Sequence, residues 1–463
     1  MQFVSTRGQA PVLSFSDAVL AGLANDGGLY LPQTWPQVSP EEIAGFAGKP
    51  FHEVAFSIIS RFTGGDIPDA DLRAMTEAAY RSFRHPSTTP LIELEPGHFV
   101  LELFHGPTLA FKDVAMQFLA RVMDHILEKR GLRATIVGAT SGDTGSAAIE
   151  AFRGRAYTDI FILHPKGRTS EVQRRQMTTV LDDNVHNIAL EGTFDDCQNA
   201  VKAMFNNHRF RDTVRLSGVN SINWGRIVAQ IVYYFTSAAA LGAPHRKVSF
   251  TVPTGNFGDV FAGYAAKRMG LGIGKLIIAT NANDILRRTL DTGRYEITGV
   301  EETASPSMDI QISSNFERLV FEALGRDAEQ LRRLMQSLGQ SGAFTLPEKA
   351  LAAIRAEFDA GTTNEADTAA TIAGTLKASG YLLDPHTAVA VNIARQKIVP
   401  GTPMISLSTA HPAKFPAAVQ AASGVAPALP LWLADLFDRP ERVSVLGNDQ
   451  GAVEAFISAR TRA

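Results

Sequence analysis

Short apolar runs alternate with amphipathic stretches through the middle of the chain. Each apolar run is followed by a turn rich in Gly, Ser, Thr or Asn and then by a helical pattern; the runs are residues 134–137, 159–163, 185–190, 216–219, 248–252 and 276–279. Strands that alternate with helices predict an α/β fold with a mostly parallel sheet covered on both faces. Ligands bind such sheets at the carboxyl ends of the strands, which is where these turns lie.

The two flanking regions have different patterns. Proline and glycine interrupt short helical patterns over the first 90 or so residues, which favours a separate N-terminal domain. Residues 330–380 are helical and charged, as in an insertion. We therefore expect three units, at residues 1–92, 93–240 and 241–463.

Composition excludes several classes of protein. The 463 residues are 45% hydrophobic and 20% charged, and 44 Lys and Arg oppose 47 Asp and Glu for a net charge of -3. This balance indicates no binding to nucleic acid or to an anionic membrane. The start of the chain lacks the pattern of a signal peptide, and no apolar stretch approaches the length of a membrane span, so we expect a cytoplasmic protein. Cys197 lies in a helical pattern and is expected to be a buried structural thiol, and no histidine pair has the spacing of metal ligands.

Lys112 is the first candidate for chemistry. It directly precedes a helical pattern that ends at Gly131. A helix N-terminus disfavours a cation, so burial and the helix dipole should lower the pKa of Lys112, as a Schiff-base lysine requires. The alternative is a lysine paired with Asp113 on a solvated turn.

A second candidate is the segment PTGNFGDVFAG at residues 253–263, between an apolar run and a helical pattern. Backbone N–H groups converge at such a helix N-terminus and form an anion site, and Gly255 and Gly258 allow close approach. The segment matches neither a Walker loop nor G-x-G-x-x-G, and a plain tight turn is the alternative.

Three further segments carry polar side chains at the ends of apolar runs. ATSGDTGSAA (139–148) offers hydroxyls and N–H groups for a carboxylate, although Asp143 could simply cap the helix. NSINWGR (220–226) offers Arg226 for a phosphate, although such an arginine is about as often a structural ion pair. SLSTAHPAKF (406–415) adds two hydroxyls, a histidine and a lysine.

These segments occur together in one order with long spacings: FHGPTLAFKD, ATSGDTG, NSIN with its arginine, GNFGD, DPHTAVA and STAHPAKF, after the opening STRG and SFSDAVLAGLANDGGLYLP. Jointly they resemble the threonine synthase family, and the resemblance runs from the N-terminus to about Phe415. It implies a fold-type II, tryptophan synthase β-like fold with two parallel-sheet α/β domains and an N-terminal domain. It also implies pyridoxal 5′-phosphate as the cofactor.

The resemblance implies a role for each matching residue. Lys112 would form the Schiff base and then act as the proton-transfer base. The other cofactor contacts would be Gly255, Asn256, Phe257, Gly258 and Asp259 around the phosphate, Thr409 or the adjacent Ser408 at the pyridine nitrogen, and Asp143 at the phenolic oxygen. Substrate would be bound by Ser141, Gly142 and Thr144 at its carboxylate and by Asn220, Ser221 and Arg226 at its phosphate. His105 and His411 lie in the same motifs and would be hydrogen-bonding neighbours of the substrate.

Two aspartates stand out among these residues. Many fold-type II enzymes have Asn where this chain has Asp143, and a carboxylate beside a phenolate is repulsive unless a proton is shared. An ionised Asp259 should point away from a cofactor phosphate.

The implied reaction converts O-phospho-L-homoserine and water to L-threonine and phosphate, in a protein that is a monomer or homodimer. A threonine or serine dehydratase is the alternative within the fold, and it needs no site for a substrate phosphate. A catalytically inactive scaffold that binds a phosphorylated metabolite is the alternative outside it.

Overall fold

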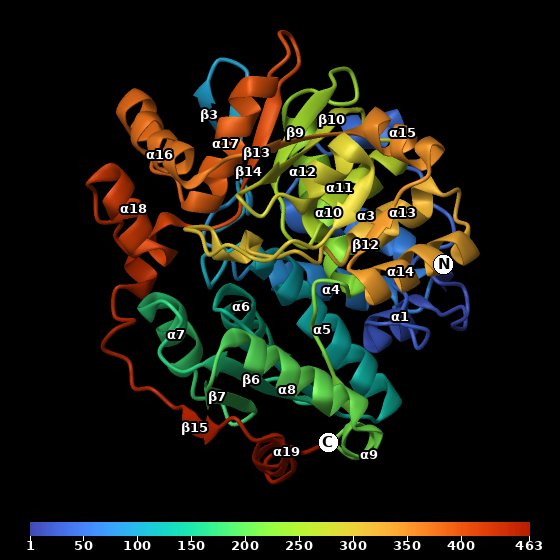
Figure 1. Cartoon of the computed structure of the whole chain (residues 1–463), viewed down its shortest axis with the longest axis vertical. Helices are drawn as coiled ribbons and strands as arrows, with labels where there is room; N and C mark the ends of the chain where they lie inside the picture. Colours follow the sequence, from blue (N-terminus) through green and yellow to red (C-terminus); the bar gives the residue numbers. More distant parts are fainter.

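The computed structural model describes residues 1–463, and its two largest sheets lie in an upper and a lower lobe (Figure 1). The sheet of the upper lobe has six strands in the order β13-β10-β9-β14-β4-β3. Its strands are β3 (Leu91–Glu95), β4 (His98–Glu102), β9 (Val248–Pro253), β10 (Ile273–Thr280), β13 (Phe358–Thr362) and β14 (Met404–Ser408). All neighbours are parallel except β3 and β4.

The sheet of the lower lobe has five parallel strands in the order β15-β7-β6-β5-β8. They are β5 (Ala134–Ala139), β6 (Thr158–Pro165), β7 (Val185–Glu191), β8 (Leu216–Ser217) and β15 (Ser444–Gly447). Five of the six predicted apolar runs overlap strands β5, β6, β7, β9 and β10, and the sixth forms the short β8. The predicted α/β class with parallel sheets is confirmed.

Helices between and around the sheets form most of the core. The helix α10 (Trp224–Ala240) is buried on nearly all sides, because its apolar residues contact α5 (Lys112–Arg130), α11 (Gly258–Arg268) and α3 (Phe51–Thr63). The remaining helices after α5 are α6 (Asp143–Phe152), α7 (Glu171–Thr178), α8 (Phe194–Asn206), α9 (His208–Thr213), α12 (Ile285–Thr292), α13 (Phe316–Ala323), α14 (Ala328–Ser341), α15 (Glu348–Glu357), α16 (Glu365–Ser379), α17 (Pro385–Lys397), α18 (Pro416–Ser423) and α19 (Gln450–Ser458), with the 3-10 turns η1 (Pro306–Met308), η2 (Pro412–Lys414) and η3 (Leu431–Leu433).

The N-terminal segment packs onto the upper lobe. It consists of β1 (Phe3–Ser5), α1 (Phe15–Ala21), β2 (Tyr30–Pro32), α2 (Pro40–Ala44), α3 and α4 (Asp69–Tyr80). Its apolar side chains belong to the same hydrophobic cluster as those of α5 and α10. The segment is therefore held by a continuous core.

Strand pairing in the two sheets crosses the predicted limit at residue 240. Strand β4 precedes residue 240 but pairs with β14, and β15 follows it but pairs with β7. The C-terminal segment runs from the upper lobe to the lower one, where β15 and α19 lie (Figure 1). The limits stay predictions about folding units.

The expected helical stretch at residues 330–380 is interrupted by two short strands, β12 (Ala343–Thr345), which pairs with β11 (Arg294–Glu296), and β13. Residues Phe358–Thr362 form β13, the edge strand that pairs with β10. This strand contains only one large apolar residue, Phe358, because its other positions are half-exposed at the sheet edge. A short edge strand lacks the continuous apolar run that identified the central strands.

Two smaller expectations concern single residues and membrane contact. Cys197 lies fully buried in a small apolar cluster of the lower lobe, and burial raises the pKa of its thiol to about 11. No helix combines the length and apolar character that crossing a bilayer needs.

Candidate active site

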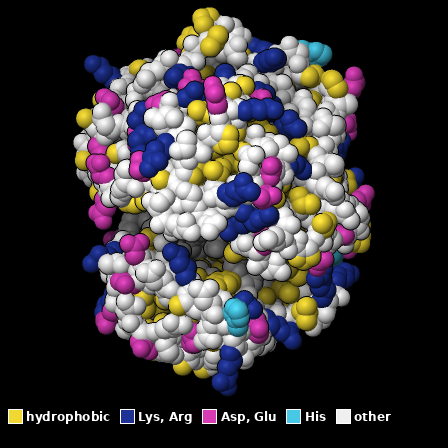
Figure 2. Space-filling view, turned by 45° about the vertical axis from the view of Figure 1, so that its right-hand side comes forward, with side chains coloured by type: hydrophobic (Ala, Val, Ile, Leu, Met, Phe, Trp, Pro, Cys, Tyr) yellow, Lys and Arg dark blue, Asp and Glu magenta, His cyan; other side chains and the backbone are white.

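The loops that follow strands of the two sheets meet between the lobes, where the molecular surface is hollowed (Figure 2). Two of these loops are joined by backbone hydrogen bonds. Phe111 N donates to Thr409 O at 2.8 Å, and His411 N donates to Leu109 O at 3.0 Å. These bonds place the start of α5 directly beside the end of β14, and so bring Lys112 to Thr409.

Lys112 is the first residue of α5 and is 8% exposed. Its Nζ lies 3.3 Å from Asp143 Oδ2 and 3.5 Å from Ser307 Oγ. Burial lowers the pKa of Lys112, nearby Asp143 opposes this shift, and the cations Lys414 and Arg226 add to it. The lysine is therefore a weaker base than a solvated one.

The alternative of a solvated pair between Lys112 and Asp113 is wrong. Asp113 is fully buried and accepts hydrogen bonds from Thr108 N at 2.8 Å and Thr108 Oγ1 at 2.7 Å. Its carboxylate closes the turn before α5, and burial raises its pKa to about 6.

Asp143 lies between two lysines at the first turn of α6. Its Oδ2 faces Lys112, while its Oδ1 lies 3.0 Å from Lys414 Nζ and accepts from Gln173 Nε2 at 2.9 Å. Burial alone would raise the pKa of Asp143, but the ammonium groups of Lys414 and Lys112 hold it well below its usual range. The carboxylate is thus ionised.

The predicted anion loop leaves its backbone donors free. None of the N–H groups of residues 255–259 donates to a backbone acceptor, and α11 has no side-chain cap. Phe257 has a left-handed φ of 63° just before α11, and a Cβ on Gly255 would lie 2.8 Å from Ser307 O. Free amides at a helix N-terminus, with no room for a side chain at Gly255, form a site for an anion.

Asp259 points from this loop toward α10, as expected of a side chain next to an anion. Its Oδ1 accepts hydrogen bonds from the hydroxyls of Tyr233 and, at 3.1 Å, Tyr234, and its Oδ2 has no partner. Burial raises the pKa of Asp259 to about 7, although the two tyrosine bonds oppose this shift. The side chain is therefore partly protonated near neutral pH and carries less negative charge toward the loop.

The loop before α6 has a similar but smaller set of free donors. Thr140 Oγ1 accepts from Gly142 N and Gly145 N, both at 2.9 Å, which fixes the turn. The N–H groups of Ser141, Asp143 and Thr144 donate to no backbone acceptor. These three donors are available to a carboxylate.

Arg226 is 4% exposed and lies in the first turn of α10. Its Nη1 donates to Val219 O at 3.3 Å, its Nε has no partner, and no carboxylate forms an ion pair with it. Burial lowers the pKa of Arg226 to about 10. The alternative of a structural ion pair is therefore wrong.

The structure brings Ser221 to the anion loop. Ser221 O lies 3.6 Å from an ideal Cβ on Gly258, and Asn315 Nδ2 donates to this oxygen at 3.3 Å. Asn220 is exposed and its side chain makes no hydrogen bond within the chain.

The hydroxyls of Ser408 and Thr409 differ in their partners. Ser408 Oγ shares a hydrogen bond of 2.9 Å with Thr387 Oγ1, which in turn donates to Asp384. No hydrogen bond within the chain involves the Thr409 hydroxyl, which favours Thr409 over Ser408 as a contact for a ligand.

Four residues near Lys112 were missed from the sequence: Ser307, Gln173, His386 and Lys414. Ser307 N donates to His386 Nε2 at 3.3 Å, and His386 Nδ1 bonds to Asp384 Oδ2 at 2.8 Å. Lys414 lies in the segment STAHPAKF and His386 in DPHTAVA, but the sequence indicated no role in the site for either. No motif identified Ser307 or Gln173.

His105 and His411 bond within the chain. His105 Nε2 lies 2.7 Å from Glu102 Oε2, and His411 Nδ1 accepts from Ala413 N at 3.1 Å. Both line a cavity of about 460 Å³. Their contact with a substrate stays a prediction.

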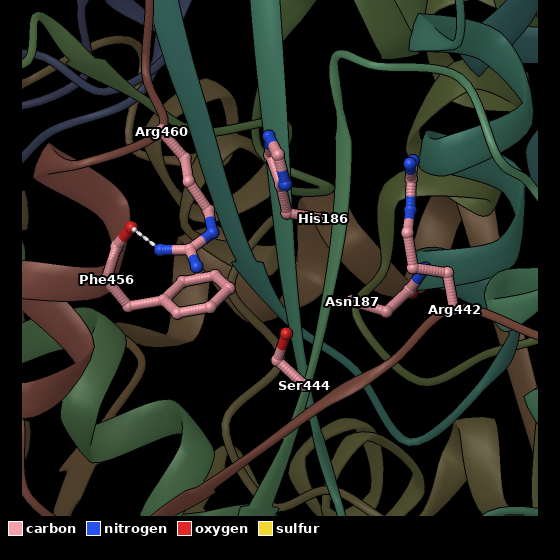
Figure 3. Close-up of a pocket in the computed structure, with 6 residues that line it drawn as sticks. All are labelled: His186, Asn187, Arg442, Ser444, Phe456 and Arg460. Carbon is pink, nitrogen blue, oxygen red and sulfur yellow. Dashed lines mark hydrogen bonds between the residues drawn. The ribbon is translucent and has the colours of Figure 1, made fainter.

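A second cavity, of about 220 Å³, lies in the lower lobe and contains none of the predicted residues (Figure 3). Arg460 lies over the Phe456 ring at 3.7 Å, and His186 stacks on Phe161 at 4.4 Å. Burial and three neighbouring arginines lower the pKa of His186 to about 4.

Three family models match the chain. Residues 2–80 match "Threonine synthase N terminus", residues 83–409 match "Pyridoxal-phosphate dependent enzyme", and residues 387–457 match "Threonine synthase, C-terminal". A threonine synthase of Pseudomonas aeruginosa is 54% identical over 99% of this chain and 98% of its own length.

Solved structures agree with these matches. A pyridoxal-phosphate-bound threonine synthase from Brucella melitensis is 63% identical, covers 100% of both chains and superposes with a TM-score of 0.99. A yeast threonine synthase is 40% identical over 99% of this chain and 98% of its own, with a TM-score of 0.95.

Proposed function

Because the chain belongs to the threonine synthase family, we propose that it converts O-phospho-L-homoserine and water to L-threonine and phosphate. The protein is a pyridoxal 5′-phosphate-dependent lyase of threonine biosynthesis that acts on a small-molecule substrate.

The residues between the lobes fit the cofactor. Lys112 is a buried amine with a lowered pKa, and the free amides of residues 255–259 match a dianionic phosphate. The unpartnered hydroxyl of Thr409, next to the start of α5, suits the pyridine nitrogen. We assign these three contacts to the cofactor, with Lys112 as the Schiff-base residue.

The bound cofactor supplies an electron sink that stabilises negative charge on the substrate's carbon atoms. The chain supplies the bases and the anion contacts. Lys112 Nζ takes protons from the substrate and returns them, since it is a buried amine of lowered pKa. Asp143 and Ser307 orient this nitrogen.

The substrate carries two anions, and the site has two sets of donors apart from the cofactor loop. The free amides of Ser141, Asp143 and Thr144 suit the substrate carboxylate. The guanidinium of Arg226 suits the substrate phosphate, with Asn220 and Ser221 beside it.

The single observation that carries the choice of substrate is that Arg226 is buried and has no carboxylate partner. A guanidinium buried without a carboxylate partner is costly, and a second phosphate group would offset that cost. A dehydratase has no such phosphate to bind.

The proposal is tested with O-phospho-L-homoserine in ¹⁸O-labelled water. Breaking the Cγ–O bond leaves the phosphate unlabelled, and water adds its labelled hydroxyl at Cβ of threonine. We expect one labelled threonine and one unlabelled phosphate per turnover. Labelled phosphate together with homoserine would mean simple hydrolysis of the phosphate ester and would overturn the proposal.

Location and assembly are part of the same proposal. We propose a cytoplasmic protein that works as a monomer or homodimer, as the resemblance in sequence implies.

A further inference from the structure

The carboxylate of Asp143 is shared unequally between its two lysines. Lys414 Nζ lies 3.0 Å from Oδ1, whereas Lys112 Nζ lies 3.3 Å from Oδ2. The closer lysine belongs to η2, after β14, and the more distant one begins α5. Only the second has a role in the proposed reaction.

Lys414 is a fixed ammonium group. Its side chain is completely buried, and its Nζ also donates to Thr108 O at 2.7 Å and Gln176 Oε1 at 3.0 Å. Asp143 Oδ1, at 3.0 Å, is the ion-pair partner of the same ammonium group. The turn that carries it is held by His411, whose ring accepts from Ala413 N.

Lys112 Nζ has fewer polar contacts than Lys414 Nζ. Besides Asp143 it has one polar neighbour, Ser307 Oγ at 3.5 Å, which is at the limit of a hydrogen bond. When Lys112 gives up its proton, or is joined to the cofactor, it no longer serves as a full cation for Asp143. A buried carboxylate left without a countercharge is strongly unfavourable.

We propose that Lys414 is a positioning residue, the permanent countercharge that keeps Asp143 ionised and aligned while Lys112 exchanges its proton and its covalent partner. This role explains how the chain can carry a buried carboxylate beside Lys112. Asp143 and Lys414 together form a neutral unit in the cofactor site. The inference rests on the proposed cofactor role of Lys112.

Several charged or titratable groups besides this pair act on Lys112 or on Asp143: Arg226 from α10, Asp259 from α11 and His386 from α17. They are unchanged in the variants below. A change in the titration of Lys112 is therefore assigned to the pair itself.

The test follows the recombination of pyridoxal phosphate with cofactor-stripped protein, read as visible absorbance, at a series of pH values. The rate depends on the unprotonated amine of Lys112. In Lys414→Met, Lys112 faces Asp143 without the second cation, so the midpoint of the rate profile should rise by about one pH unit or more. At a fixed pH below the midpoint, recombination should be about tenfold slower.

Asp143→Asn should shift the midpoint the other way, and the double variant Asp143→Asn with Lys414→Met should return toward the wild-type value. Lys414→Arg keeps the charge and should stay closer to wild type than Lys414→Met. Lys166→Met is the matched control, because Lys166 forms an exposed ion pair with Glu191 in the lower lobe.

A midpoint that is the same in Lys414→Met and wild type would overturn the proposal. If Lys414→Met fails to fold, the double variant decides: its folding would show that Lys414 is needed only to balance Asp143, and its failure would assign Lys414 a structural role instead. A wild-type protein that never becomes coloured would contradict the proposed function. The Asp143–Lys414 coupling would then be measured in thermal unfolding of wild type, the two single variants Lys414→Met and Asp143→Asn, and the double variant.

Discussion

Two buried arginines in different regions, Arg318 and Arg226, differ in how many hydrogen-bond partners their guanidinium groups have. Arg318 lies in α13, at the seam with the N-terminal segment, and donates to Tyr30 O, Ile222 O and Asn315 Oδ1. Arg226 lies in the site between the lobes and is nearly as buried, yet it donates only to Val219 O. Burial lowers the pKa of both guanidinium groups, to about 9 and about 10.

The same contrast holds for the groups around them. At the seam, Glu317 accepts from Thr6 Oγ1 at 2.6 Å and Arg7 Nη2 at 3.0 Å, so each charge has partners. In the site, the backbone donors of residues 255–259 have none. Residues 257–259 of this loop are buried, and buried polar groups are nearly always paired in folded proteins, so their unpaired donors indicate where a ligand belongs.

The largest effect, on stability, should come from removing the Arg318 hydrogen bonds at the contact between α13 and the N-terminal segment. Arg318→Leu removes the Arg318 donors from three acceptors, of which Tyr30 O and Asn315 Oδ1 belong to buried residues. This should lower the free energy of unfolding by about 3 kcal/mol or more. Denaturant unfolding with cofactor present measures this loss. Normal stability combined with lost activity would mean that Arg318 is a site residue.

The matched change in the site, Arg226→Leu, should lower activity and leave stability intact. Stability should be unchanged or higher, since a buried cation without an ion-pair partner is removed. The value of kcat/KM for O-phospho-L-homoserine should fall about 100-fold, mainly through KM.

Binding of L-homoserine, which lacks the phosphate, is the control for Arg226→Leu and should change little. If both ligands weaken equally, Arg226 does not bind the substrate phosphate, and the dehydratase alternative regains support.

A smaller effect, on cofactor binding, is expected from a change in the anion loop at residues 255–259. A Cβ at Gly255 would lie 2.8 Å from Ser307 O, a backbone atom, so Gly255→Ala should weaken cofactor binding about tenfold. Gly374→Ala is the control, because nothing lies within 4 Å of its added Cβ in α16. Equal cofactor affinity in the two variants would contradict a tight cradle at residues 255–259.

The sequence predicted the central strands and the start of α5 well, because apolar runs and a regular helical pattern are local signals. It did not predict β13 or β15, whose pairing with β10 and β7 depends on contacts distant in the chain. Edge strands are half-exposed and carry little of the apolar pattern.

The candidate site was predicted to a similar extent. Residues in turns after strands were found, because their position follows from the fold. Lys414 and Ser307 were not, because their roles depend on where η1 and η2 fold back toward Lys112. The charge state of Asp143 likewise depends on Lys414, which is 271 positions further along the chain.

The smallest effect is expected for Asp259, on the pH dependence of stability. Burial raises its pKa from 3.8 to about 7, so between these pH values the folded chain binds more protons than the unfolded one. Its contribution to stability is therefore present below about pH 4 and is lost as the pH rises to about 7. Asp259→Asn should flatten this decline in thermal unfolding measured from pH 4 to 8, and an unchanged profile would mean that Asp259 is ionised throughout.

The central claim is that Lys112 holds the cofactor, and it has a direct competitor in Lys414, the other buried lysine of the site. Borohydride reduction of the coloured protein, followed by peptide mapping, identifies the lysine that carries the pyridoxyl group. We predict a single modified residue, Lys112, and a colourless Lys112→Ala variant. A pyridoxyl group on Lys414, or a Lys112→Ala protein that keeps its colour, would contradict the account.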